Sequence, residues 1–220
     1  MGNITQLDFA LGQVMDALDE QGLTENTLFI FTSDNGPEGK GGIKGGSTGG
    51  LRGRKRDDFE GGIRVPGIVR WPGHIQPGTV SDIPIIGSDI FATALDVAGV
   101  HLPTDRKIDG VSMLPAFDGK PLVRDIPMFW RTHVSLPDSR VAIRIGNWKM
   151  VGNETMDVLL LFNVVDDPAE TKNLAETFPE KYYEIKQKLF EVWDDIQAEG
   201  PGEWWLDPNN PIRKGYKLAY

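Results

Sequence analysis

The sequence predicts an α/β fold, and three observations support this prediction. A helical pattern, a short apolar run, a second strand pattern and a second helical pattern follow one another over the first hundred residues. The polar segment 33–36 directly follows the first strand pattern, where α/β sheets place their ligands. From about residue 104 prolines and aspartates precede strand-like runs and a last helix. We therefore expect a partial sheet with flanking helices over residues 1–125 and a small C-terminal α+β subdomain, with antiparallel strands, over 126–220.

The first elements are a helix over residues 3–21 and a strand over residues 27–32. Apolar side chains recur at helical spacing in the first segment, at Ile4, Leu7, Leu11, Val14 and Leu18, and Gly22 is placed to end the helix. Residues 27–32 are a short apolar run rich in strand-forming residues. Such a run is typical of a strand that is buried on both faces.

Residues 39–62 hold ten glycines and six lysines or arginines, which predicts a long, mobile surface loop. A strand pattern follows over residues 63–71 and stops at Pro72-Gly73. Residues 88–100 then predict a helix, with Ser88 as its N-cap and Gly99 near its end.

The C-terminal part predicts two strands and a helix. The strand-like runs cover residues 141–151 and 158–164, and a turn at Gly152-Asn153 would let them pair as a hairpin. The last helix is expected over residues 178–197, with the apolar stripe Tyr182, Ile185, Leu189, Val192 and Ile196. A tail rich in proline and tryptophan follows.

The overall composition excludes several classes of partner. With 23 basic and 32 acidic residues the net charge is −9, which opposes binding to nucleic acid or to an anionic membrane. No apolar run is long enough to span a membrane, and the N-terminus has no pattern of an export signal. The chain has no cysteine, which excludes disulfides and a cysteine nucleophile.

Asp34 and Asn35 are candidate metal ligands. A carboxylate and an amide oxygen at consecutive positions beyond a strand suit hard cations such as Ca²⁺ and Mg²⁺. Asp-Asn-Gly is also a common turn sequence, and two oxygen donors are too few for a calcium site. A metal bound here must therefore take further ligands from elsewhere.

The glycine-rich loop carries a cluster of cations that suits a tetrahedral oxyanion. These residues are Arg52, Arg54, Lys55 and Arg56. Guanidinium and ammonium groups bind sulfate or phosphate oxygens through charge-assisted hydrogen bonds. The alternative is a solvated charge run, balanced by the acidic neighbours Asp57, Asp58 and Glu60. A cation site followed by a basic loop favours hydrolysis of an anionic ester.

The three histidines are separate in the sequence. His74 follows Gly73 and His101 lies two residues before Pro103, and both are typical of turns. His133 follows an aromatic segment and is a candidate for lining a pocket and exchanging protons, although a structural role is the alternative.

Short motifs in a fixed order resemble the C-terminal half of type I sulfatases, within the alkaline phosphatase superfamily. They lie at residues 32–36 (TSDNG), 51–55 (LRGRK), 59–66 (FEGGIRVP), 71–73 (WPG), 109–112 (DGVS), 141–144 (VAIR), 148–149 (WK), 161–163 (LFN) and 167–174 (DPAETKNL). The resemblance implies a sulfatase-like α/β sheet, Asp34 and Asn35 as ligands of Ca²⁺ or Mg²⁺, and Lys55 as a sulfate contact. It also implies sulfated small molecules or carbohydrates as substrates, and a periplasmic, secreted or lysosomal location. Glu60 and Arg64 belong to the motif that shapes the turn after the loop.

One departure from the family concerns the nucleophile. Sulfatases carry, in an N-terminal half, two metal-binding aspartates and a Cys/Ser-x-Pro-x-Arg segment whose first residue becomes formylglycine, and these 220 residues contain no such segment. We therefore expect a truncated form that lacks sulfatase activity alone and either forms homo-oligomers or requires the missing half. The alternatives are hydrolysis of a phosphodiester, phosphonate or carboxyl ester through a rearranged site, or a non-catalytic oligomerising module.

Overall fold

A computed structural model describes residues 2–39, 46–132, 139–153 and 155–199. The chain divides into two compact units, which are considered separately. The first comprises Met1–Lys55 and Glu60–Met128, and the second comprises Arg56–Phe59 and Phe129–Tyr220. Residues 56–59 thus belong to the second unit although the chain on both sides of them belongs to the first. None of the helices in the described ranges is both long and apolar enough to cross a bilayer.

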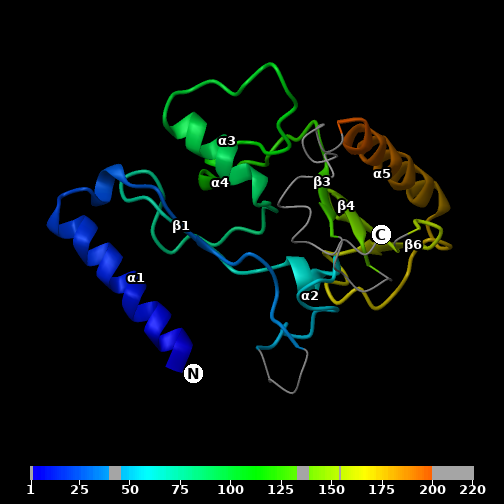
Figure 1. Cartoon of the computed structure of the whole chain (residues 1–220), viewed down its shortest axis with the longest axis horizontal. Coiled ribbons are helices and arrows are strands. Elements are labelled where there is room, and N and C mark those ends of the chain that lie inside the picture. The colour runs from blue at the N-terminus through cyan, green and yellow to red at the C-terminus, as the bar shows by residue number, and fades with distance from the viewer. Residues whose placement is uncertain (1, 40–45, 133–138, 154, 200–220) are drawn as a thin grey trace, which may run out of the picture. The chain divides into compact units, whose positions relative to one another are not determined.

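The first unit contains two paired strands and several helices (Figure 1). In chain order the elements are α1 (Gly2–Glu20), the 3₁₀ helix η1 (Thr24–Asn26), β1 (Phe29–Thr32), α2 (Glu60–Ile63), β2 (Gly67–Arg70), α3 (Ser88–Val97) and α4 (Leu114–Phe117). Strands β1 and β2 are antiparallel, with Phe29 opposite Arg70 and Thr32 opposite Gly67. The end of β1 is therefore next to the start of β2.

The expected helix and first strand of this unit are confirmed, with several differences. β1 is half-buried along most of its length instead of being buried on both faces. Three residues of the apolar stripe of α1 are exposed (Ile4, Leu7 and Val14), with Ile4 75% exposed, and Leu11 and Leu18 are half-buried. Ser88 is already inside α3 and Gly87 is the N-cap, so the predicted cap was wrong by one residue. The short helices α2 and α4 had no helical periodicity long enough to predict them.

A buried ion pair connects distant segments of the first unit. Asp89, in the first turn of α3, is fully buried and accepts hydrogen bonds from both terminal nitrogens of Arg124, at 2.7 and 2.5 Å. The same carboxylate accepts the backbone N–H groups of Ile86, at 2.8 Å, and Val111, at 3.0 Å. Because four donors satisfy one carboxylate, its burial does not leave an unpaired charge.

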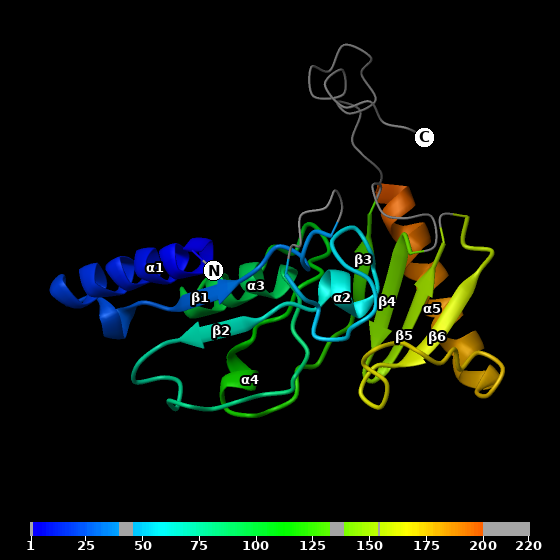
Figure 2. The ribbon, with the colours of Figure 1, turned by 90° about the horizontal axis from the view of Figure 1, so that it is seen from below.

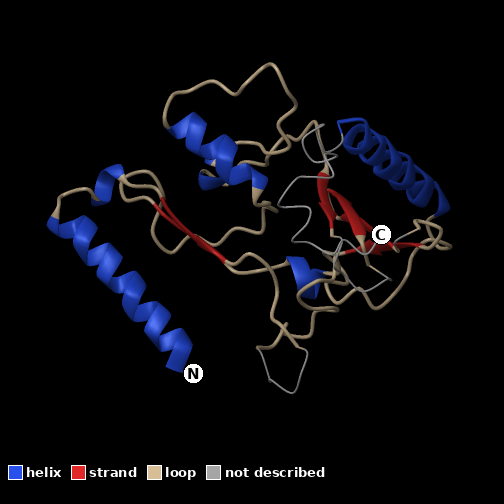
Figure 3. Cartoon of the chain, viewed as in Figure 1, coloured by secondary structure: helices blue, strands red, loops and turns tan. Residues whose placement is uncertain are grey.

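The second unit is a four-stranded sheet with one long helix. Its elements are β3 (Met128–Arg131), β4 (Val141–Ile145), β5 (Trp148–Gly152), β6 (Leu159–Asn163) and α5 (Pro179–Glu199). The strands lie in the order β3-β4-β5-β6, and β4, β5 and β6 pair antiparallel (Figure 2). Figure 3 distinguishes the sheet from the loops that join its strands.

Strand alternation gives this sheet two apolar faces. On one face Ile143, Met150 and Leu161 pack against Ile185 and Leu189 of α5, all of them fully buried. The opposite face carries a second buried cluster, made by Phe59, Ala142, Val151, Phe162 and Val164. The sheet is therefore covered by α5 on one side and receives Phe59 on the other.

The predicted strands in this unit were correct in type and partly wrong in pairing. Residues 141–151 form two strands, β4 and β5, because the chain turns at Gly146, whose φ of 58° favours glycine. The predicted pairing with the later strand is confirmed for β5, where Gly152 lies opposite Leu159. β3 was not predicted. The last helix is confirmed, with Ile185 and Leu189 in the core.

Candidate functional site

Asp34 and Asn35 lie in the turn that directly follows β1. The Thr32 hydroxyl donates to the Pro66 carbonyl oxygen at 3.0 Å, which holds the end of the strand. The Ser33 hydroxyl donates to the Asn35 carbonyl oxygen at 3.0 Å and closes the turn. Asp34 is exposed and Asn35 is half-buried. The structure therefore leaves the carboxylate of Asp34 accessible to a ligand.

Glycines allow three segments of backbone to meet next to this turn. The Gly36 N–H donates to the Gly62 carbonyl oxygen at 2.8 Å, and the Gly61 N–H donates to the Arg52 carbonyl oxygen at 2.6 Å. A Cβ atom at position 36 would lie 1.9 Å from the Gly61 carbonyl oxygen. Only glycine fits there, because a side-chain carbon at that distance would overlap the neighbouring backbone.

Lys55 is attached to the same backbone cluster. Its N–H donates to the Pro37 carbonyl oxygen at 3.1 Å, two residues after Asn35. The Arg54 side chain donates to the Gly39 carbonyl oxygen at 3.0 Å. Lys55 is half-buried. The described part of the glycine-rich loop is thus held by backbone contacts, so that the main chain of Lys55 lies next to the turn that carries Asp34 and Asn35.

The acidic residues beside the cations are buried, so their interpretation as part of a solvated charge run was wrong. Asp57, Asp58 and Glu60 are 6%, 4% and 2% exposed. Glu60 forms an ion pair with Arg64 across 3.6 Å within the first unit. The buried Phe59 between these carboxylates was the sequence signal for burial, since a run of solvated charges has no reason to contain a large aromatic residue.

The donors at the turn fit part of a site for a hard cation. Asp34 supplies an exposed carboxylate, and Asn35 an amide oxygen beside it. Within the described ranges, no three or more His, Asp or Glu side chains form a group that could hold a metal ion. The two donors therefore need further oxygen ligands for a complete coordination shell. His133, the candidate for proton exchange, lies outside the described residues.

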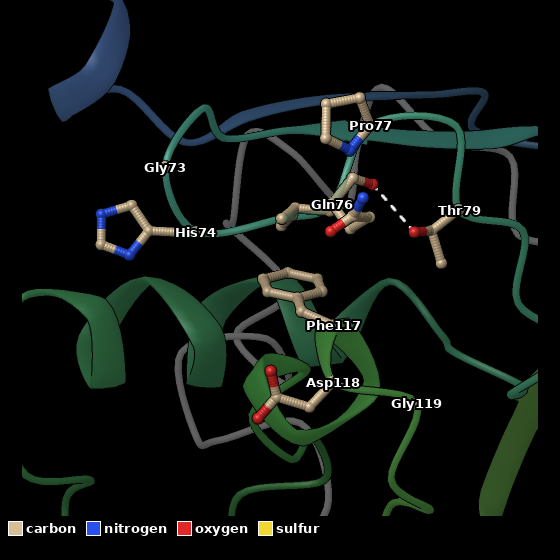
Figure 4. A pocket seen from close by; sticks show the side chains of 9 residues that line it. Gly73, His74, Gln76, Pro77, Thr79, Phe117, Asp118 and Gly119 are labelled. Carbon is tan, nitrogen blue, oxygen red and sulfur yellow. Dashed lines mark hydrogen bonds between the residues drawn. The ribbon is translucent and has the colours of Figure 1, made fainter.

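A separate cavity of about 630 Å³ lies at the other end of the β1-β2 pair (Figure 4). It follows β2, which runs back towards the start of β1, and its lining includes Gln76, Thr79, Phe117 and Asp118. The His74 ring stacks on Trp71 at a centroid distance of 3.8 Å, which agrees with its predicted turn role. None of the predicted metal or sulfate ligands lines this cavity.

Two protein-family models match the chain. The model described as "Sulfatase" matches residues 1–100, and the model described as "N-sulphoglucosamine sulphohydrolase, C-terminal" matches residues 53–199. Human steryl-sulfatase is 34% identical over 224 aligned residues. That alignment covers 87% of this chain and 38% of the human protein.

Solved structures resemble the chain over most of its length. The crystal structure of Ps i-CgsB superposes with a TM-score of 0.71 at 27% identity, covering 96% of this chain and 47% of that one. The same protein has been solved with k-i-k-neocarrahexaose. A phosphonate monoester hydrolase of Agrobacterium radiobacter has a TM-score of 0.61 at 26% identity, covering 87% of this chain and 40% of that one. The chain therefore spans less than half the length of each of these relatives.

Proposed function

The chain belongs to the sulfatase family, and we propose that its protein hydrolyses sulfate esters with Asp34 and Asn35 as cation ligands and Lys55 as the sulfate contact. The observation that carries this proposal is the hydrogen bond between the Lys55 N–H and the Pro37 carbonyl oxygen. It attaches the lysine to the turn that holds both oxygen donors. One tetrahedral oxyanion between them would contact the ammonium group and the cation together.

The charges of these residues fit their proposed roles. A bound Ca²⁺ or Mg²⁺ would polarise the ester and offset the negative charge of its sulfate oxygens. The Lys55 ammonium would donate charge-assisted hydrogen bonds to the same group. Asp34 would hold the cation through its exposed carboxylate. The net charge of −9 makes a local cationic group necessary, because the chain as a whole repels an anionic substrate.

We propose carbohydrate or aryl sulfates as the substrate class. The structure of Ps i-CgsB with an oligosaccharide and the similarity to human steryl-sulfatase support substrates with a ring next to the sulfate. These 220 residues contain no cysteine and no Cys/Ser-x-Pro-x-Arg segment. We therefore assign the nucleophile to a part of the protein outside this sequence, and to this chain the cation and sulfate contacts.

The proposal is tested by binding of 4-methylumbelliferyl sulfate to the chain, followed calorimetrically with millimolar CaCl₂ or with EDTA. Calcium should strengthen binding, and Lys55→Gln should weaken it at least tenfold. Arg52→Gln is the matched control, because it removes one positive charge from the same loop, and it should weaken binding only a few-fold. Equal effects of the two substitutions would contradict a specific role for Lys55. Release of the fluorophore above the buffer rate would contradict the assignment of the nucleophile elsewhere.

Hydrolysis of a phosphonate ester is the second candidate. The resemblance to the phosphonate monoester hydrolase favours it, since the phosphonate group is also a tetrahedral oxyanion. The same calorimetric titration with 4-methylumbelliferyl phenylphosphonate, a phosphonate monoester with the same fluorophore, separates the candidates. Tighter binding of the phosphonate ester than of the sulfate ester would favour phosphonate-ester hydrolysis over sulfate-ester hydrolysis.

A further inference from the structure

Residues 56–59, here called the latch, are bound to the sheet of the second unit. Phe59 is 5% exposed, and its ring meets that of Phe162 edge-on at a centroid distance of 6.3 Å. Ala142 and Val151 complete the apolar cluster. Burial of the phenylalanine ring stabilises the bound latch. The latch directly follows Lys55 in the chain.

Two consecutive latch residues bond to one hydroxyl group. The Asp58 N–H donates to the Ser139 hydroxyl oxygen at 3.4 Å, and this hydroxyl donates to a carboxylate oxygen of Asp57 at 3.1 Å. Ser139 is fully buried and lies two residues before β4. Asp57 and Asp58 are therefore both bonded to the chain that leads into the sheet.

The Asp58 carboxyl group is buried in a poorly compensated position. Its Oδ2 atom accepts no hydrogen bond from the residues that the structure describes. The nearby cation is Lys149, which is fully buried on β5 and forms an ion pair with Glu170 at 3.0 Å. Lys149 favours the ionised form of Asp58, but the loss of hydration on burial outweighs this attraction. A buried carboxylate that is not fully compensated favours its neutral form.

We propose that the latch is pH-sensitive: it stays on the sheet while Asp58 is neutral and opens once Asp58 is ionised. The charged groups around Asp58 come from each packed segment. They are Asp57 on the latch itself, Lys149 on β5 and its partner Glu170 after β6. Arg140 follows Ser139 in the chain. Asp57 and Glu170 oppose a further negative charge in this cluster, whereas Lys149 favours it.

The pKa of Asp58 is consistent with this device. The pKa is raised from 3.8 to about 7: burial is the largest cause, Lys149 lowers the pKa, and Asp57 raises it. When the latch is open, the carboxyl group returns to its ordinary pKa. The stabilisation of the closed latch by neutral Asp58 is therefore fully present below about pH 4. It is lost as the pH rises to about 7 and changes no further above that value. Within this window the opening constant rises by up to about tenfold per pH unit.

The consequence for the candidate site depends on the proposed function. If Lys55 binds sulfate, an open latch releases the chain next to it and weakens its positioning. The sulfate site would then be best ordered in acidic solution. The latch itself is defined without a ligand, so its opening can be measured independently of sulfate binding.

Hydrogen–deuterium exchange of the full chain, expressed as protection factors for a peptide covering residues 57–62, tests the proposal between pH 4.5 and 8.5. Protection should fall by up to about tenfold per pH unit up to pH 7 and then level off. Asp58→Asn, which keeps the shape of the side chain, should remove this dependence. Asp57→Asn is the matched control. Its protection factors should fall with the same slope but level off at a lower pH, because the substitution removes a charge that raises the Asp58 pKa.

Flat protection of the wild-type peptide, or an unchanged slope in Asp58→Asn, would overturn the proposal. Should Asp58→Asn fail to fold, the wild-type chain still provides the test through NMR titration of the Asp58 carboxyl carbon. A midpoint near pH 7 supports the latch, and a midpoint near 4 contradicts it. A normal latch together with no sulfate binding would refute only the proposed function.

Discussion

The Gly36 N–H donates a hydrogen bond of 2.8 Å to the Gly62 carbonyl oxygen, and its α-carbon faces the carbonyl oxygen of Gly61. This pair of contacts joins the turn after β1 to the end of the basic loop. Because Gly61 also bonds to Arg52, the segments before and after Lys55 are fixed to the same turn. The glycines therefore determine the geometry of the candidate site although they contribute no chemistry to it.

Gly36→Ala should disrupt this junction. A Cβ atom would lie 1.9 Å from the Gly61 carbonyl oxygen, so the backbone must move. We expect the free energy of unfolding to fall by about 1–3 kcal/mol, together with loss of calcium-dependent sulfate-ester binding. Gly12→Ala in α1 is the control: nothing lies within 4 Å of the added carbon, and a gain of about 0.5–1 kcal/mol is expected. Urea denaturation measures both. Equal stability of the two variants would contradict the close approach at Gly36.

Arg124→Gln should destabilise the first unit by about 3–5 kcal/mol, because it leaves the buried Asp89 carboxylate without its ion-pair partner. The matched control is Arg106→Gln, which removes an arginine from the solvent-exposed pair with Asp105. This control should not change stability measurably. Thermal unfolding of both variants, followed by circular dichroism, measures the effect. Equal decreases in the two melting temperatures would contradict the structural role of Arg124.

Glu170→Gln should destabilise the second unit by about 3–5 kcal/mol, since it leaves the charge of Lys149 buried without its partner. The combined variant Lys149→Met and Glu170→Gln should recover most of this loss, because it removes the buried charge itself. Urea denaturation of the single and double variants measures the coupling. Additive losses in the double variant would show that the two side chains do not interact.

Acid should weaken the second unit through Asp167. The backbone N–H of Lys172, together with Thr171, lowers the pKa of this carboxyl group below 3.8. The ionised Asp167 therefore stabilises the folded unit above about pH 3.8, and this stabilisation is lost as the pH falls through the lowered pKa. The pH dependence is the opposite of that expected for Asp58. Asp167→Asn should flatten the decline of the melting temperature below about pH 4. Asp166→Asn, at the neighbouring exposed position, should leave that decline in place.

The sequence predicted regular elements where a pattern repeats over several turns or along a whole strand. The stripe of α5 shows the helical period because one face of this helix is buried, and the apolar runs of β5 and β6 reflect burial of both faces of the sheet. β3 and α4 escaped prediction, since four residues are too few to show a period. Gly146 was a recognisable turn residue within the 141–151 run, but the strand pattern on both sides outweighed it in the interpretation.

At the candidate site, the sequence identified residues by their chemistry and order. The contact between Lys55 and Pro37 joins segments separated by eighteen positions and depends on glycines that approach one another closely. No local periodicity encodes such a contact. The burial of Asp58 escaped prediction for a related reason: charge alone indicates solvent exposure, whereas the cost of burial is offset here by the apolar packing of Phe59.

In the proposed site Asp34, Asn35 and Lys55 share one cation and one oxyanion. Titration of the labelled chain with paramagnetic Mn²⁺ in the presence of sulfate, read from the NMR signals of these side chains, tests this directly. We predict that the Lys55 Cε signal broadens in parallel with that of Asn35, and that Asp34→Ala abolishes both effects. Broadening of Asn35 with an unaffected Lys55, or no broadening of either, would contradict a shared site.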